Sequence, residues 1–344
     1  MTIATVGLDL AKNVFQVHAV DGAGRVLARK ALRRGQVLPF FAKLAPCLVG
    51  MEACGTSHYW GRQLSELGHE VRLMSPAYVK PYVKRGKTDA GDAEAICEAV
   101  TRPTMRFVPV KSPDQQAALA MHRARDLMVR QRTQLVNMIR GLLGEFGITI
   151  NRGLHHALEL VTRITRGAAI EVPALAARVV TALAAQVMEL QGRLTSLERE
   201  LLAWFRQNDV ARRLETIPGI GVVVATAFAA TVTDPQRFRS GRQFAAWLGL
   251  TPLANSSGGK ERMGRISKMG DPYLRRLMVV GATSRVRVAR RTPERERPLA
   301  ELLQRKPARV ATVAVANRTA RIVWALMARG GVYRSSAAVA SASP

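Results

Sequence analysis

Four acidic residues stand where carboxylates commonly do chemistry on phosphates. Asp9 and Glu52 each follow a short apolar run, TVGL and LVGM, while Asp89 and Asp92 belong to a helix-forming run, DAGDAEA. The chain has 52 Lys and Arg against only 25 Asp and Glu. In so basic a chain, carboxylates at strand ends and a helix start are best explained as ligands of a divalent cation. This acidic quartet predicts metal-dependent phosphoryl transfer.

The charge of the chain indicates the partner. A formal net charge of +27 is typical of a protein that binds a polyanion. The basic residues occur along the whole chain rather than in one cluster, which favours nucleic acid over an acidic lipid surface as the partner. The sequence contains no run of about 18 or more uncharged apolar residues, so no membrane span is predicted. Three scattered cysteines without a CxxC pair suggest neither disulfides nor zinc. With no signal-peptide pattern at the start, we expect a cytoplasmic location.

The first hundred residues alternate between strand and helix patterns. Apolar or alternating runs predict strands over residues 2–10, 14–20, 25–32, 47–53 and 69–76. Helical patterns cover residues 36–45, 57–68 and 89–101. Three strands in a meander, then helix, strand, helix, strand and helix, is the order of an RNase H-like fold. Asp9 and Glu52 would end strands, and Asp89 and Asp92, three residues apart, would share one helix face.

The middle of the chain is predicted to be helical. One helix pattern begins near Pro113, and a second carries apolar residues at alternating spacings of three and four. The seam comprises Val180, Leu183, Val187, Leu190, Leu194, Leu197 and Leu201. Such a seam serves equally well as an antiparallel pair buried within one chain or as a dimerisation surface.

The last third is expected to be mainly helical. TIPGIGVVVATAFAA resembles a helix-hairpin-helix, whose turn, with Gly219 and Gly221, can present backbone amides to a phosphate. A Gly/Ser/basic segment, NSSGGKERMGRISKMG, follows. Asp271 and Pro272 have the residue types of an N-cap and first helical position, and Thr292 with Pro293 repeats that start.

The quartet also has plainer explanations. A strand-end aspartate such as Asp9 is often a turn residue, and Asp89 and Asp92 fit the first turn of a helix, where the dipole favours acids. Glu52 is harder to explain in this way, because a carboxylate after an apolar run is costly to bury without a partner. Taken together the four favour a metal site, which by itself does not separate nuclease, resolvase, integrase and transposase.

Motifs along the whole chain narrow this choice. GLDLAKN, GMEACG, KTDAGDAEAI, TIPGIG, RQFAAWLGLTP and SSGGKERMGRISKMGDPYLRR occur in this order. From Gly7 to about Arg329 the chain resembles the DEDD insertion-sequence transposases, a family of bridge-RNA-guided recombinases. The resemblance implies a RuvC-like (RNase H fold) domain over residues 1–104 and a helical coiled-coil region over 105–207. A mainly helical transposase domain over 208–333 and a disordered tail over 334–344 would complete the chain.

The resemblance also assigns roles to residues. The acidic quartet matches the family's acids, which bind Mg2+ (or Mn2+). Ser257, five residues beyond the proline of LTP, matches the nucleophile, and its neighbour Ser256 leaves the register open. Basic residues nearby would stabilise a pentacovalent phosphorane or hold the nucleic-acid backbone. These are Lys260, Arg262, Arg265 and Lys268, and Arg275 and Arg276 are further candidates for nucleic-acid binding. A solvated basic loop is the plain alternative for Lys260 and Arg262.

The implied partners are DNA at the element ends and target, a structured guide RNA from the element's own end, and further copies in homodimers or homotetramers. Such a protein would associate with the nucleoid when active. A Holliday-junction resolvase or nuclease that uses water is one alternative, and a non-catalytic nucleic-acid-binding protein is another. Metal dependence separates catalysis from binding, and the serine separates transposition from hydrolysis.

Overall fold

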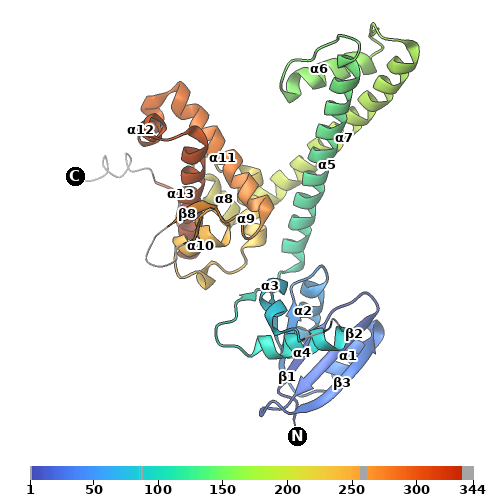
Figure 1. Cartoon of the computed structure of the whole chain (residues 1–344), viewed down its shortest axis with the longest axis vertical. Helices are drawn as coiled ribbons and strands as arrows, with labels where there is room; N and C mark the ends of the chain where they lie inside the picture. Colours follow the sequence, from blue (N-terminus) through green and yellow to red (C-terminus); the bar gives the residue numbers. More distant parts are fainter. Residues whose placement is uncertain (1, 85, 87, 256–261, 335–344) are drawn as a thin grey trace, which may run out of the picture. The chain divides into compact units, whose positions relative to one another are not determined.

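The structure is a computed structural model that describes residues 2–84, 86, 88–255 and 262–334. The chain divides into two compact units, Met1–Pro113 and Asp114–Pro344, and each is described by itself. Figure 1 shows both units coloured along the sequence.

The first unit is built on a mixed six-stranded sheet with strand order β3-β2-β1-β4-β5-β6. The strands are β1 (Thr5–Asp9), β2 (Val14–Val20), β3 (Val26–Arg33), β4 (Leu48–Glu52), β5 (Glu70–Met74) and β6 (Phe107–Val108). The first three form an antiparallel meander, β1, β4 and β5 run parallel, and β6 is antiparallel to β5. The predicted α/β domain is confirmed, and this arrangement is consistent with an RNase H-like fold. The two-residue strand β6 was not predicted from the sequence pattern.

Helices cover both faces of this sheet. They are α1 (Val37–Phe41), α2 (Ser57–Glu66), α3 (Pro76–Val79) and α4 (Asp89–Val100), with short 3-10 turns at Arg34–Gln36 and Lys80–Tyr82. Val6 and Leu8 of β1 are fully buried in a core shared with α1 and α2. Gly7 lies between them in sequence, so it faces the opposite side of the sheet, where it meets α4.

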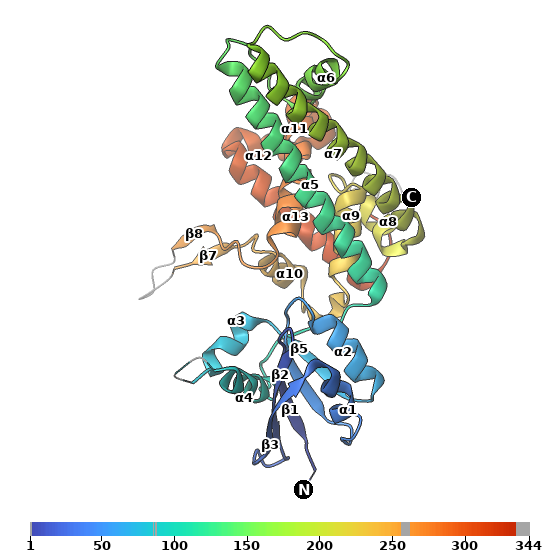
Figure 2. The ribbon, with the colours of Figure 1, turned by 90° about the vertical axis from the view of Figure 1, so that its right-hand side faces the viewer.

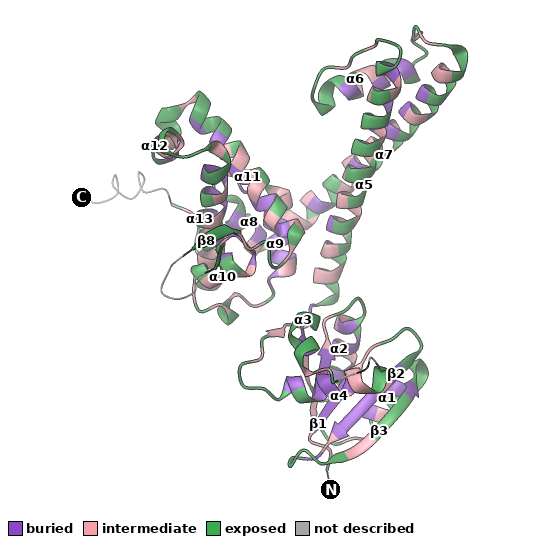
Figure 3. Cartoon of the chain, viewed as in Figure 1, coloured by how far each residue is buried: buried purple, intermediate pink, exposed green. Residues whose placement is uncertain are grey.

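The second unit begins with an antiparallel pair of long helices. They are α5 (Pro113–Gly144) and α7 (Ala174–Gln207), and the sequence pattern missed the helix between them, α6 (Leu154–Thr165). Arg125 pairs with Glu198 and Arg132 with Gln191, so residue numbers rise on one helix as they fall on the other. Along the predicted seam, every seventh residue (Val180, Val187, Leu194 and Leu201) is buried, whereas Leu183, Leu190 and Leu197 are only half-buried. Figures 2 and 3 show the pair and its burial.

The rest of the unit is mainly helical, as predicted. It contains α8 (Asp209–Glu215), α9 (Val222–Thr231), α10 (Gly241–Trp247), α11 (Pro272–Arg291), α12 (Arg297–Arg305) and α13 (Ala308–Arg329), with 3-10 turns at Pro235–Arg237 and Pro293–Glu296. One large core joins these helices, with Phe228, Phe244 and Leu274 fully buried. The N-cap at Asp271 is confirmed, because its Oδ1 accepts hydrogen bonds from the amides of Tyr273 and Leu274 at 2.7 and 3.1 Å.

The sequence pattern predicted no strand in the segment between α10 and α11. This segment contains a two-stranded antiparallel ribbon, β7 (Pro252–Ala254) with β8 (Met263–Ile266). Most residues of the ribbon are exposed, and Figure 2 shows it extending from the helices of its unit. Such a ribbon is stabilised by its backbone pairing rather than by a core, which is why apolar periodicity did not reveal it.

Candidate metal centre and active site

The sheet brings two of the predicted acids to one edge. Strands β1 and β4 run parallel, with Leu8 paired to Met51. Asp9 and Glu52 are the next residues along, each the last of its strand. Because parallel strands end at the same edge of a sheet, both carboxylates lie at that edge.

Helix α4 supplies the other two acids from its first turn. Thr88 is the N-cap, and its hydroxyl accepts a hydrogen bond from the amide of Gly91 at 3.1 Å. Asp89 and Asp92 follow, both in the first turn. The positive end of the helix dipole favours acids here, so the helix stabilises the same carboxylates that the site requires.

Two glycines allow α4 to approach the strands closely. A Cβ added at Gly7 would lie 2.1 Å from the carbonyl oxygen of Ala93, and one at Gly50 would lie 2.8 Å from the Cβ of Val100. These distances are too short for any side chain, so only glycine permits this contact. The glycines of GLD and GME therefore determine how near α4 brings its acids to Asp9 and Glu52. The sequence pattern alone did not predict this role for either glycine.

Three of the four carboxylates meet within the reach of one cation. Ligand oxygens of Asp9, Asp89 and Asp92 all lie within 4.8 Å of one another, with Asp89 exposed and the other two half-buried. Hard oxygen ligands from carboxylates suit Mg2+ and Mn2+. The residue types and their spacing therefore fit a divalent metal ion.

Glu52 lies beside this trio rather than within it. Burial raises the pKa of its carboxyl above the ordinary value, and the charges of Asp9 and Asp92 raise it further. Like charges gathered in a half-buried site destabilise one another unless a cation compensates them. The raised pKa of Glu52 is thus a second sign that this edge of the sheet suits a metal ion.

A positioning contact near α4 was not foreseen from the sequence. Lys84, in the segment before α4, donates a hydrogen bond of 2.5 Å to Glu94 on that helix. This bond lowers the pKa of Glu94, and Arg29 of β3 lies 3.7 Å from the same carboxylate. Glu94 thus ties the helix to the segment leading into it. Glu94 and Lys84 are ten positions apart, a spacing that no helix or strand periodicity marks, so the sequence pattern did not predict this contact.

The predicted nucleophile lies outside the described residues, as do Ser256 and Lys260. Arg262, Arg265 and Lys268 are described and exposed. Arg265 lies on β8, and Lys268 has a positive φ of 54°, unusual for a residue with a side chain.

Two predicted DNA-binding arginines have partners within the unit. Arg275 donates to the carbonyl oxygens of Met269 and Leu248 at 2.9 and 3.3 Å, and so anchors the turn before α11. Arg276 pairs with Asp126 of α5 and lies over the ring of Tyr273. These contacts give both side chains a structural role.

The turn that was predicted to resemble a helix-hairpin-helix joins α8 to α9. Gly219 has a φ of +85°, and a Cβ there would lie 2.9 Å from the carbonyl oxygen of Gly281 on α11. The turn is therefore held against α11 by a contact between two glycines. Gly221, the N-cap of α9, is exposed, and a Cβ added there would meet no atom within 4 Å.

Among the described residues, no helix is long and apolar enough to cross a membrane. Residues 6–148 match a DEDD-type family profile described as transposase, and residues 211–297 match one described as the transposase IS116/IS110/IS902 family.

Similar proteins extend over nearly the full length. The chain is 51% identical to a probable family 20 transposase of Pseudomonas aeruginosa, covering 97% of this chain and 99% of that protein. It is 40% identical to the transposase for insertion sequence element IS1328 of Yersinia enterocolitica, over 96% and 98% of the two chains. It is 38% identical to the transposase for IS1111A of Coxiella burnetii, over 97% and 92%. With its carboxylate cluster and these full-length similarities, the chain belongs to the IS110/IS116/IS902 family of insertion-sequence transposases, enzymes that act on DNA.

Proposed function

We propose that this transposase cleaves and exchanges DNA strands in a reaction that requires Mg2+ or Mn2+ and uses Ser257 as the nucleophile. The observation that carries the proposal is the cluster of Asp9, Asp89 and Asp92 within 4.8 Å, with Glu52 beside it. DEDD-type transposase domains typically use divalent metal ions, which agrees with this donor set.

The acidic quartet would hold the ion, and a bound divalent ion would supply Lewis-acid stabilisation of the phosphate charge. The serine hydroxyl is a weak nucleophile until its proton is removed. Its Oγ would form a bond to phosphorus while one P–O bond to deoxyribose breaks, and the leaving oxygen would take up a proton. The resulting phosphoserine ester conserves the bond energy, so the strand can be rejoined to a new hydroxyl without ATP.

Basic residues that flank Ser257 in the sequence support this role. Arg262, Arg265 and Lys268 follow it closely and are exposed, and exposure leaves the cations of Arg265 and Lys268 accessible to a phosphate. In a tight site such cations stabilise the negative charge that develops on the phosphate oxygens. We further propose that an element-encoded structured RNA guides the choice of DNA, and that copies of the chain assemble as dimers or tetramers.

Covalent trapping tests the nucleophile. We expect wild-type protein with Mg2+ and a nicked suicide substrate to give a denaturation-resistant protein–DNA adduct, and we expect Ser257→Ala to give neither adduct nor recombination. Ser256→Ala is the matched control and should retain some of each. Digestion of the adduct and mass spectrometry would then identify the modified serine.

Three outcomes would change the assignment. Modification of Ser256 would shift the nucleophile by one residue. Cleavage by Ser257→Ala at the wild-type rate would mean that water attacks, as in a resolvase or nuclease. Equal affinity for RNA from the element's flank and for unrelated RNA of the same length would remove the guide and favour non-specific binding.

A further inference from the structure

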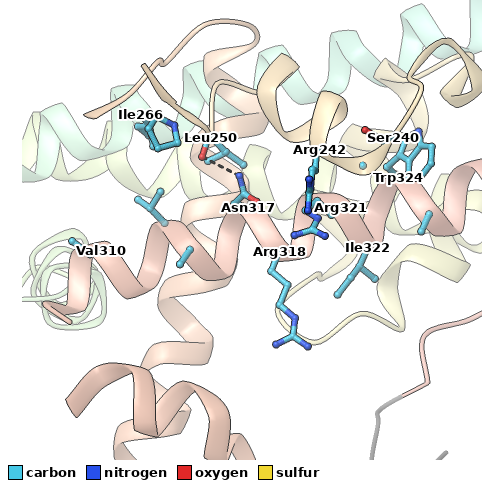
Figure 4. Close-up of a pocket in the computed structure, with 15 residues that line it drawn as sticks. Ser240, Arg242, Leu250, Ile266, Val310, Asn317, Arg318, Arg321, Ile322 and Trp324 are labelled. Atoms are coloured by element: carbon cyan, nitrogen blue, oxygen red, sulfur yellow. Dashed lines mark hydrogen bonds between the residues drawn. The ribbon is translucent and has the colours of Figure 1, made fainter. Parts of the chain in front are cut away.

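A groove opens in the second unit where α10 crosses α13, beside the base of the β7–β8 ribbon (Figure 4). Its volume is about 1070 Å3, at the upper limit of small-molecule sites, which span roughly 300–1,000 Å3. Apolar side chains form much of its wall: Leu250, Ile266, Val310, Val313, Ile322 and Ala325. Val310 is 53% exposed, so part of this wall faces solvent.

The charge of the groove is supplied by arginines. Arg242 comes from α10, and Arg318 and Arg321 come from α13. No Asp or Glu is among the described residues that line the groove. Within the described part of the chain, none of these arginines forms an ion pair or a side-chain hydrogen bond. Cations gathered without a carboxylate create a positive potential that an anion would relieve.

The crossing of the two helices holds the arginines in place. A Cβ added at Gly241 would lie 3.1 Å from the Cα, Cβ and carbonyl oxygen of Arg321, so α10 rests directly on the backbone of α13. Figure 4 shows Arg242 reaching from α10 toward Arg321, while Arg318 extends from another part of α13. The spacing of the cations is thus set by a helix contact rather than by a loop.

The groove adjoins the base of the β7–β8 ribbon. Pro252 and Ile266 line the groove and pair with each other at the base of the ribbon. Asn317 of α13 donates a hydrogen bond of 3.1 Å to the carbonyl oxygen of Leu250, which anchors the chain just before β7. In the sequence, Ser257 falls between the residues of β7 and those of β8. A nucleic-acid strand bound in the groove would therefore pass the base of the β7–β8 ribbon.

We propose that this groove binds single-stranded DNA flanking the cleaved phosphodiester. Phosphates contact Arg242, Arg318 and Arg321, and unstacked bases lie against the apolar wall. The inference rests on the proposed function for the choice of DNA as the polyanion and for the place of the cleaved bond.

The chemistry of the groove favours a single strand over the alternatives. Duplex DNA keeps its bases stacked inside and presents mainly phosphates and groove edges, so it would leave the apolar wall exposed to water. A single strand offers both phosphates and flat apolar base faces, which is the combination that such sites recognise. As an occupant of this groove, a second copy of the chain would have to present an acidic segment to the arginines, and the chain has only 25 Asp and Glu against 52 Lys and Arg.

A pair of matched double variants tests the groove in the full-length protein. Arg242→Gln with Arg321→Gln removes two groove cations. Arg305→Gln with Arg309→Gln removes the same charge from exposed positions that do not line the groove. Fluorescence anisotropy in EDTA would measure binding of a labelled oligodeoxynucleotide of about 16 nucleotides, the upper range of single-strand sites. The duplex and an RNA of the same sequence are measured alongside.

We expect the groove variant to bind single-stranded DNA roughly tenfold more weakly and to lower the salt slope by about 1.4, or about 0.7 for each lost phosphate contact. The control variant should keep both values near wild type. Val310→Ser should weaken single-strand binding without changing the salt slope, because it removes apolar contact and no charge.

Several outcomes would overturn the inference. These are unchanged single-strand affinity in the groove variant, an equal loss for duplex, or a loss confined to RNA, which would make RNA the occupant. Cleavage by the wild-type protein is assayed separately with Mg2+. If the wild type does not cleave but the groove variant still loses single-strand binding, the proposed function fails while the groove assignment stands.

Discussion

Replacing Asp92 with Asn distinguishes two possible roles of this residue, a ligand of a metal ion and an acid that stabilises the start of helix α4. Asparagine keeps the volume of the side chain but removes its charge from a cluster whose ligand oxygens lie within 4.8 Å of one another. If Asp92 is a metal ligand, the substitution should stabilise the metal-free fold, because it relieves the repulsion between neighbouring carboxylates. In a first-turn acid without a metal role, it should destabilise the fold, because it loses the helix dipole interaction.

The magnitudes favour a net gain in stability. Two carboxylates at 4.8 Å repel by about 3.5 kcal/mol at an effective dielectric constant of about 20, and by about 1 kcal/mol in bulk water. Because Asp89 is exposed and Asp9 and Asp92 are half-buried, the lower figure is the safer one. The dipole interaction is worth only about 0.3–1 kcal/mol, and relief acts on two neighbours. We therefore expect Asp92→Asn to stabilise the metal-free first unit by about 1 kcal/mol, a rise in Tm of roughly 4–8 °C for a unit near 100 residues.

Metal should reverse the order of stability. At a hundredfold excess over its Kd, a bound ion stabilises the wild type by about 2.7 kcal/mol, and Asp92→Asn should lose most of this gain together with strand cleavage. Calorimetry with EDTA and with Mg2+ measures both effects, and hydrogen exchange in peptides from β1 and α4 locates them. Glu98→Gln, on the same helix but paired with Arg102, is the matched control. The reasoning is refuted if Asp92→Asn is less stable than wild type in EDTA or keeps the full Mg2+ response.

Three further predictions concern other parts of the chain. Because the pKa of Glu52 is raised in the fold, the folded state keeps the proton of this carboxyl to a higher pH than the unfolded chain does. The free energy of unfolding of the metal-free protein should therefore fall as pH rises from the ordinary glutamate pKa through the raised one. Glu52→Gln should remove this fall, as measured by denaturant titrations at several pH values. Gly7→Ala should push α4 from β1, lowering both Tm and cleavage, whereas Gly35→Ala, which has open space, should change neither. Leu190→Glu with Leu197→Glu, at half-buried seam positions, should give a smaller species in size-exclusion chromatography; an unchanged elution volume would assign the seam to the intrachain pair alone.

Local patterns were sufficient for much of the fold. Short continuous apolar runs identified the strands that end at Asp9 and Glu52, because β1 and β4 are buried on both faces of the sheet. The i, i+3 spacing of Asp89 and Asp92 was enough to place both acids in one helical turn. The N-cap at Asp271 was equally local, since its hydrogen bonds reach only two and three residues along the chain. The short strands β6, β7 and β8 gave no such signal, because a few paired residues establish no period.

The sequence by itself therefore determined which residue types were present, in which order, and on which kind of element. The tertiary structure decided what they do together. Contact of α4 with Gly7 and Gly50 brings its carboxylates to the sheet edge, and burial beside those charges raises the pKa of Glu52. Likewise, Arg242 and Arg321 are far apart in sequence and share a groove only because α10 crosses α13. Distances and electrostatic potentials depend on separation in space, which the fold sets and the sequence pattern does not record.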